Sequence, residues 1–322
     1  MRRAERGFGV TVTAVCQQLG MSRQNYYACR QERQRRAVDE GLLVALVRVE
    51  RQRQPRLGGR KLHHLIRQEL VKAGIKVGRD RFFEVLRAHS LLLAPVPAEY
   101  PCTTHSNHYL PVYGNRIKGL AVQQPNEVWV GDLTYLRTVE GFLYLALLTD
   151  KWSRKIVGYH CGDTLEAVGC VQALKMALAT LPAGEHPIHH SDQGSQYCSH
   201  EYVNGLRARG LTVSMTEADH CAENALAERM NGILKQEYGL GQRMKTKAQA
   251  RQLAAQAVSL YNTRRPHLAL GMRTPAAVHS CAAGLAAQPA KPLRGCVPAR
   301  RLACTPPRSG LTPTQQQNPI TK

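Results

Sequence analysis

The sequence predicts an α/β unit, a mixed β-sheet flanked by helices, preceded by an all-α region of helix–turn–helix units. Residues 1–92 show helical periodicity interrupted at glycine, proline and serine. A proline-rich linker, residues 93–122, follows them. Residues 123–284 then alternate in the order β-β-β-α-β-α-β-α, and such an order builds a mixed sheet covered by helices.

The charge of the chain is unevenly distributed. The 322 residues contain 44 Lys and Arg against 23 Asp and Glu, a formal net charge of +21. The positive excess lies in the first 100 residues and in a tail, residues 285–322, that has no acidic residue and that we expect to be disordered. A basic region joined to a nearly neutral one indicates a nucleic-acid-binding module. The alternative is a basic surface that only aids solubility.

The ten cysteines are dispersed and form no CxxC pair. The sequence shows neither a secretory signal nor an apolar run long enough to cross a membrane. We therefore expect free thiols and a cytoplasmic, nucleoid-associated protein without membrane contact. Cys102, His105 and His108 suggest a zinc site, but no second cysteine pair at ligand spacing completes it.

The first segment, residues 1–36, has a helix–turn–helix rhythm. Gly20 supplies the turn and Ser22 can cap the second helix. Arg30–Arg36 is interpreted as a polar, basic connector. A plain helical hairpin is the alternative.

Residues 37–92 form a second, arginine-rich helical unit that we expect to bind DNA. Its helices are expected at Leu42–Glu50, Arg60–Ala73 and Arg79–His89, with breaks at Pro55 and Gly58. Basic side chains at helix starts can neutralise phosphates, which gives affinity but no sequence information. Four side chains are candidates for this role: Arg60, Lys61, Arg79 and Arg81.

The segment from residue 123 to 284 begins with three strands joined by tight turns, which must form an antiparallel meander. The strands of the sheet are expected at Glu127–Thr138, Phe142–Asp150, Lys155–His160, Pro187–His190 and Leu211–Met215. The helices are expected at Leu165–Thr180, Glu201–Arg209 and Cys221–Gln236.

Three acidic residues stand at informative places in this order. Asp132 lies within the first strand, Asp192 follows the fourth, and Glu228 lies on the last helix. A mixed sheet can place the first and fourth strands side by side, so the two aspartates could meet, while the helix would cross one edge of the sheet. Converging carboxylates repel one another and favour Mg²⁺ or Mn²⁺ over zinc. The alternative is an ordinary surface helix with a solvated polar face.

Several motifs resemble those of DDE transposases with a retroviral-integrase-like, RNase H-like catalytic core. The acidic residues lie in WVGDLTYL, HHSDQGSQY and ENALAERMNGILKQE, and 35 residues separate Asp192 from Glu228, as in that superfamily. Tyr261–Pro275, YNTRRPHLALGMRTP, and Leu57–Ile66, LGGRKLHHLI, resemble segments of the OrfB-type transposases of bacterial two-frame insertion sequences. The resemblance covers roughly residues 40–280.

This resemblance implies metal-dependent DNA strand cleavage and strand transfer at the ends of an insertion sequence. Asp132, Asp192 and Glu228 would be the catalytic residues and would hold two Mg²⁺ (or Mn²⁺) ions. Lys235 would touch DNA, and Asn224 would contact DNA or orient the acid. The implied partners are double-stranded DNA, further copies of the chain in a synaptic complex, and an upstream-frame (OrfA) protein or a fusion with it.

Two other functions remain open from the sequence. A catalytically decayed copy could act as a DNA-binding regulator that occupies the insertion-sequence ends. An RNase H-like nuclease without strand transfer would not need the helix–turn–helix units or Tyr261–Pro275. The chain also departs from the family at Ala222-Glu223, where a Tyr-Asp pair is usual.

Overall fold

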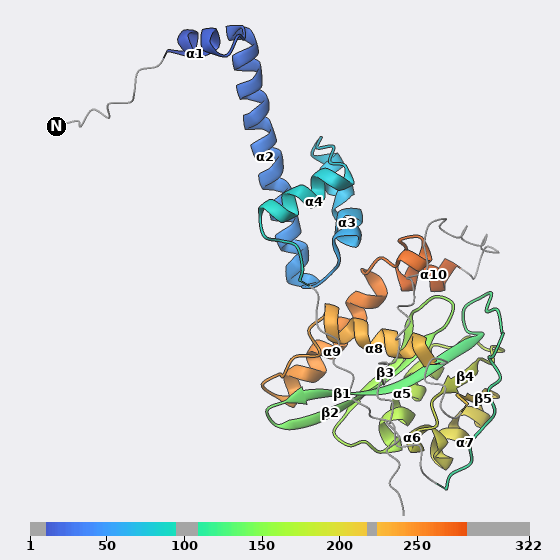
Figure 1. Cartoon of the computed structure of the whole chain (residues 1–322). Coiled ribbons are helices and arrows are strands. Elements are labelled where there is room, and N and C mark those ends of the chain that lie inside the picture. Colours follow the sequence, from blue (N-terminus) through green and yellow to red (C-terminus); the bar gives the residue numbers. More distant parts are fainter. Residues whose placement is uncertain (1–10, 95–108, 218–223, 282–322) are drawn as a thin grey trace, which may run out of the picture. The chain divides into compact units, whose positions relative to one another are not determined.

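The computed structural model of the chain describes residues 11–94, 109–217 and 224–281 (Figure 1). All of them belong to one compact unit. The basic tail, the Cys102–His108 group, Ala222-Glu223 and much of the linker lie outside the described residues. No helix among the described residues is long and apolar enough to cross a membrane.

The N-terminal region begins with a helix, a tight turn and a second helix, as the sequence predicts. Helix α1 spans Val12–Gln18 and helix α2 spans Arg23–Arg53. Gly20 makes the turn with φ +62°, a conformation that glycine adopts without strain. The Ser22 hydroxyl caps α2 by accepting a hydrogen bond from the Asn25 backbone N–H at 3.1 Å.

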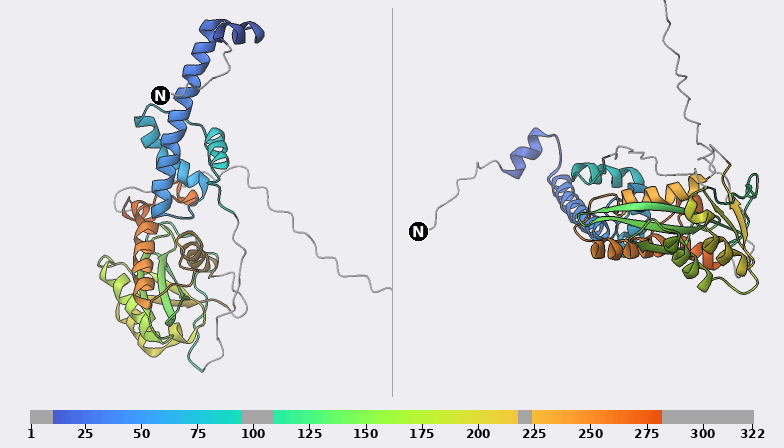
Figure 2. Two further views of the ribbon diagram at one scale, coloured as in Figure 1. Left: turned by 90° about the vertical axis from the view of Figure 1, so that its left-hand side faces the viewer. Right: turned by 90° about the horizontal axis from the view of Figure 1, so that it is seen from below.

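The connector predicted at Arg30–Arg36 is wrong, because α2 runs through it without a break (Figure 2). Its polar residues are mainly Gln, Glu and Arg, which are strong helix formers, and no proline or glycine interrupts residues 23–40. The helix predicted at Leu42–Glu50 is therefore the second half of one 31-residue helix.

Helices α3, Gly59–Lys72, and α4, Arg79–Ala88, pack on the second half of α2. Each presents apolar residues at helical spacing to a shared core, so the three helices form a small bundle. Fully buried members of this core include Leu43, Val47, Leu57, Leu62, Leu70, Phe82 and Leu86.

The second region is built on a five-stranded mixed sheet in the order β3-β2-β1-β4-β5 (Figure 1). The strands are β1 Val128–Thr138, β2 Gly141–Asp150, β3 Ile156–Gly162, β4 Ile188–Ser191 and β5 Thr212–Met215. The first three strands form the predicted antiparallel meander, and β4 pairs in parallel with both β1 and β5. The predicted adjacency of the first and fourth strands is confirmed.

Helices cover both faces of this sheet, which explains the nearly continuous apolar sequence of β2. Ala146 and Leu148 belong to a core with α5, Ala167–Ala179, the short α6, Ser195–Cys198, and α7, His200–Ala208. The alternate residues of β2 belong to a second core with helices α8 and α9: Leu143, Leu145 and Leu147.

Helix α8 spans Ala225–Glu237 and α9 spans Lys247–Thr263. The expectation that this helix crosses a sheet edge is wrong, since α8 packs on the interior strands β1 and β2 (Figure 1). Its apolar stripe needs a wide apolar surface, and the leucines of β2 supply one. Met230, Ile233 and Leu234 are all buried there.

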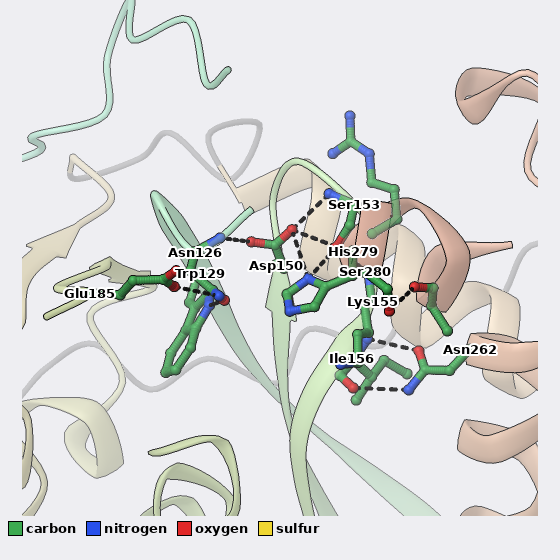
Figure 3. A network of polar contacts seen from close by, with 12 residues as sticks. Asn126, Trp129, Asp150, Ser153, Lys155, Ile156, Glu185, Asn262, His279 and Ser280 are labelled. Carbon is green, nitrogen blue, oxygen red and sulfur yellow. Dashed lines mark hydrogen bonds and ion pairs between the residues drawn. The ribbon is translucent and has the colours of Figure 1, made fainter. Parts of the chain in front are cut away.

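A buried polar network fixes the last helix, α10, Pro275–Cys281, to the turn between β2 and β3 (Figure 3). Asp150 accepts hydrogen bonds from the backbone N–H groups of Ser153, at 2.7 Å, and Asn126, at 2.8 Å. The Ser153 hydroxyl lies 3.0 Å from Nδ1 of His279 in α10. Asp150 and Ser153 have no exposed surface, so the network holds the fold together.

The continuity of α2 can be tested at Gly41, which lies inside the helix with free space around its Cα. Replacing it with alanine should raise the free energy of unfolding by about 0.5–1 kcal/mol, because alanine loses less backbone entropy in a helix. Gly158→Ala, in strand β3, is the contrasting substitution. An added Cβ would collide there with the Ala173 carbonyl, so the free energy of unfolding should fall by about 2 kcal/mol. Urea unfolding measures both, and no gain at Gly41 would contradict a continuous helix.

Candidate active site

The sheet register brings Asp132 and Asp192 to neighbouring positions. Strands β1 and β4 are parallel, and Val130 is the partner of His190. Two residues further along each chain stand Asp132, within β1, and Asp192, directly after β4. Both side chains are partly buried. We refer to these two carboxylates as the acid pair.

The environment of Asp132 disfavours its negative charge. Burial raises the pKa of Asp132 to about 7, and the charges of Asp192 and, more weakly, Glu228 act in the same direction. Two hydrogen bonds oppose the shift without cancelling it, from the Leu133 backbone N–H at 2.9 Å and from the Asn231 amide at 2.6 Å. A bound cation would supply the positive charge that this carboxylate lacks.

Helix α8 is held against β1 beside the acid pair by two buried asparagines. The Asn224 amide donates to the Gly131 carbonyl at 3.2 Å, and the Asn231 amide donates to Oδ2 of Asp132. Glu228 follows Asn224 by four residues and precedes Asn231 by three, so all three lie on one helix face. This face turns Glu228 toward the acid pair.

The structure brings two of the three predicted acids together and leaves the third beside them. Glu228 is exposed, and no three His, Cys, Asp or Glu side chains among residues 11–94, 109–217 and 224–281 lie close enough together to hold a metal ion. In the part of the chain that the structure describes, the side-chain oxygens of Asn224 and Asn231 are buried and have no hydrogen-bond partner. These oxygens and the acid pair are hard ligands that suit a hydrated divalent cation.

Asn231 is a site residue that helical periodicity places on the face of Glu228 but to which the sequence analysis gave no role. Its amide is the side-chain donor to Asp132, and it is 7% exposed. Its position three residues after Glu228 was a usable signal, because residues three apart on a helix share a face.

Lys235 lies on the same face of α8, one turn beyond Asn231. Its ammonium lies 4.6 Å from the centre of the Tyr135 ring, a cation–π contact. The negative charge of Asp132 favours the charged form of Lys235. Burial lowers the pKa of Lys235 below its usual value. Lys235, the residue predicted to contact DNA, thus places a positive charge beside the acid pair.

The remaining predicted DNA-binding residues fall into different environments. Lys61 is not placed as expected, because its side chain is 13% exposed and forms an ion pair with Glu237 at 3.1 Å. Asn224 is buried against Gly131, and this favours a role in orienting α8 over DNA contact. The other three are exposed: Arg60, Arg79, which pairs with Asp80, and Arg81, which pairs with Glu40 and Glu84.

Comparison with known proteins identifies the family of the chain. The family model described as the integrase core domain matches residues 122–221, and a second model of the same description matches residues 209–275. A 31 kDa protein of insertion element IS600 from Shigella sonnei is 36% identical over 267 residues, which are 82% of this chain and 96% of that protein. The transposase of insertion sequence IS629, also from Shigella sonnei, is 30% identical, over 82% of this chain and 90% of its own. Transposase InsF of insertion sequence IS3A from Escherichia coli (strain K12) is 31% identical, over 70% of this chain and 79% of its own.

The mixed sheet with its flanking helices is therefore an integrase core with an RNase H-like fold, the catalytic unit of a polynucleotidyl transferase. The chain belongs to the family of insertion-sequence transposases that carry this core. Its reaction is transposition by DNA cleavage and strand transfer, as the sequence motifs predict.

The raised pKa of Asp132 makes a prediction about stability in metal-free buffer. Because the folded chain holds this proton more tightly than the unfolded chain does, stability should fall as pH rises from 3.8 to about 7. Asp132→Asn removes the charge, so at pH 8 the variant should be more stable than the parent by on the order of 1–2 kcal/mol. At pH 5, where the parent is also neutral at this position, the difference should shrink.

Thermal unfolding with EDTA at both pH values measures this difference. Asp163→Asn is the control, because hydrogen bonds from Lys247 and Arg251 lower the pKa of this exposed carboxylate. It should show no gain at pH 8. Equal stability of Asp132→Asn and the parent at pH 8 would contradict the environment described for Asp132.

Proposed function

We propose that Asp132, Asp192 and Glu228 are the catalytic residues of this transposase and that they hold magnesium. The observation that carries the proposal is the acid pair itself: Asp132 within β1 and Asp192 directly after the neighbouring strand β4, where burial and the charge of Asp192 raise the pKa of Asp132. Such a pair is stable as two anions only when a cation joins it. Oxygen ligands favour Mg²⁺, with Mn²⁺ as a substitute.

The residues around the acid pair have different proposed roles. Asn231 holds one oxygen of Asp132, and Asn224 holds α8 on β1, so that Glu228 faces the acid pair. Lys235 places a positive charge beside it, where a DNA phosphate can bind. We propose an occupancy of two ions; when bound, they would stabilise the charge that develops on the attacking and leaving oxygens of a phosphodiester.

The proposed partners are duplex DNA and other protein chains. The substrates are the insertion-sequence ends and a target duplex, and exposed basic side chains such as Arg60, Arg79 and Arg81 support the binding of their phosphates. Two ends must be held together for transposition, so we propose a homo-oligomeric synaptic complex. An upstream-frame (OrfA) protein, or a fusion with it, would supply most of the sequence-specific recognition in a nucleoid-associated complex.

Neutral replacements of the three acids test the assignment. Asp132→Asn, Asp192→Asn and Glu228→Gln should each reduce Mg²⁺-dependent cleavage of DNA that carries the insertion-sequence ends by about 1,000-fold or more, because each removes charge that the cations need. End binding, measured by gel mobility shift, should change little. Asp163→Asn should cleave normally. Normal cleavage by one of the three variants would remove that residue from the site, and an inactive parent that still binds ends would favour the decayed regulator.

Metal binding can be tested apart from activity. Saturating Mg²⁺ should stabilise the parent chain at pH 8 by roughly 1–3 kcal/mol, because the ion binds the folded chain only. Asp132→Asn should show little of this gain. Ca²⁺, which also binds oxygen ligands, is the comparison cation in the same measurement. Thermal unfolding with and without EDTA measures the effect. Equal Mg²⁺ stabilisation of parent and variant would place the cation elsewhere.

A further inference from the structure

The motif Tyr261–Pro275 has no part in the acid pair, yet its first residues contact several different elements. Tyr261 is buried at the end of α9, and its hydroxyl donates to the Arg154 carbonyl in the turn between β2 and β3 at 2.9 Å. The Asn262 side chain exchanges two hydrogen bonds with the backbone of Ile156, each at 2.9 Å. Since Ile156 lies in the edge strand β3, Asn262 satisfies backbone groups that a missing neighbour strand would leave unpaired.

The two arginines that follow make bidentate ion pairs with distant helices. Arg264 binds Glu50 of α2, with Nε–Oε1 at 3.0 Å and Nη2–Oε2 at 2.6 Å. Arg265 binds Glu237, the last residue of α8, with both distances at 2.7 Å. Glu50 is 3% exposed and Arg265 is 2% exposed, so these charges are largely removed from water.

Glu237 is also the point where the N-terminal helices meet α8. The Lys61 ammonium of α3 lies 3.1 Å from Oε1 of Glu237, and the Arg56 backbone N–H donates to the Glu237 carbonyl at 3.2 Å. The next residue, Tyr238, donates its hydroxyl to Gln54 at 3.0 Å. Burial alone would raise the pKa of Glu237, but Arg265 and Lys61 hold it below its usual value. Glu237 is therefore charged and fully paired.

Glu228 and Glu237 are nine residues apart on one helix. They point to opposite sides of α8 and are separated by about 13.5 Å along its axis. A helix of this length moves as a rigid body, so a shift at Glu237 also moves Glu228. Because Glu228 stands beside the acid pair without closing on it, the placement of α8 decides how far the third carboxylate reaches.

We propose that Lys61, Glu237 and Arg265, here called the α8 clamp, are positioning residues that set the reach of Glu228 toward the acid pair. Through Lys61 the clamp links this reach to α3, the helix that also carries the proposed DNA-binding residue Arg60. The inference rests on the proposed role of Glu228 as a metal ligand. If the α8 clamp served only stability, its replacement would lower the free energy of unfolding. It would not lower the cleavage rate of the folded chain while leaving its affinity for end DNA unchanged.

Lys61→Met is the sharpest test, because Glu237 keeps its bidentate partner Arg265 while its link to α3 is removed. At saturating end DNA and Mg²⁺, the single-turnover cleavage rate should fall about tenfold, as expected for a modest misplacement of a catalytic group. The Kd for end DNA should stay within about twofold of the parent value, as expected for a lysine that contacts no phosphate. The Mg²⁺-induced rise in Tm should become smaller. Lys72→Met, on the same helix but exposed and paired with Glu69, is the matched control and should change none of these.

Arg265→Lys provides a second variant that keeps the charge and loses the bidentate geometry, and it should shift the rate and the Mg²⁺ response in the same direction. A parental cleavage rate in Lys61→Met would overturn the inference. So would weaker end binding with an unchanged rate at saturation, since Lys61 would then be a DNA contact. Absence of Mg²⁺-dependent cleavage in the parent would overturn the proposed function and this inference with it, whereas a parental rate in Lys61→Met overturns the inference alone.

Discussion

Two carboxylates held close together on the adjacent strands β1 and β4, one within β1 and one directly after β4, are the constraint on which the catalytic region depends. Their mutual repulsion and partial burial disfavour the folded state near neutral pH, as the raised pKa of Asp132 shows. The surrounding structure offsets this cost. Strand β1 is paired with β2 from Trp129 to Thr138, and apolar cores cover both faces of the sheet. The acid pair is thus placed by elements that are themselves strongly stabilised, as a preorganised site requires.

Helix α8 contacts the acid pair with one face and the apolar core with another. Its apolar stripe packs on the leucines of β2, while Asn224 and Asn231 attach it to β1 beside the acid pair. Its last residue, Glu237, receives Arg265 and Lys61. One helix therefore joins the core, the acid pair and the N-terminal helices, and this explains why the YNTRRPH segment, far from the acids in sequence, bears on the same helix.

Two of the expectations that differ from the structure relied on local composition alone. A polar, basic stretch such as Arg30–Arg36 has the composition of a linker, yet its residues favour a helix and nothing interrupts it. Likewise, a lysine at a helix start looks the same in sequence whether it faces a phosphate or a carboxylate. Lys61 faces Glu237, which is 176 residues away along the chain, and no local pattern contains that pairing.

The sequence by itself determined the order of strands and helices, the three acidic motifs with their spacing, and membership of the transposase family, because these depend on local periodicity and on short motifs. Only the tertiary structure decided which acids meet, that Glu228 stands beside the pair, that Asn231 binds Asp132, and that Arg265 and Lys61 hold the end of α8. These contacts join residues far apart in the chain. They exist because strand pairing and core packing bring the residues together, and neither is written in any single segment.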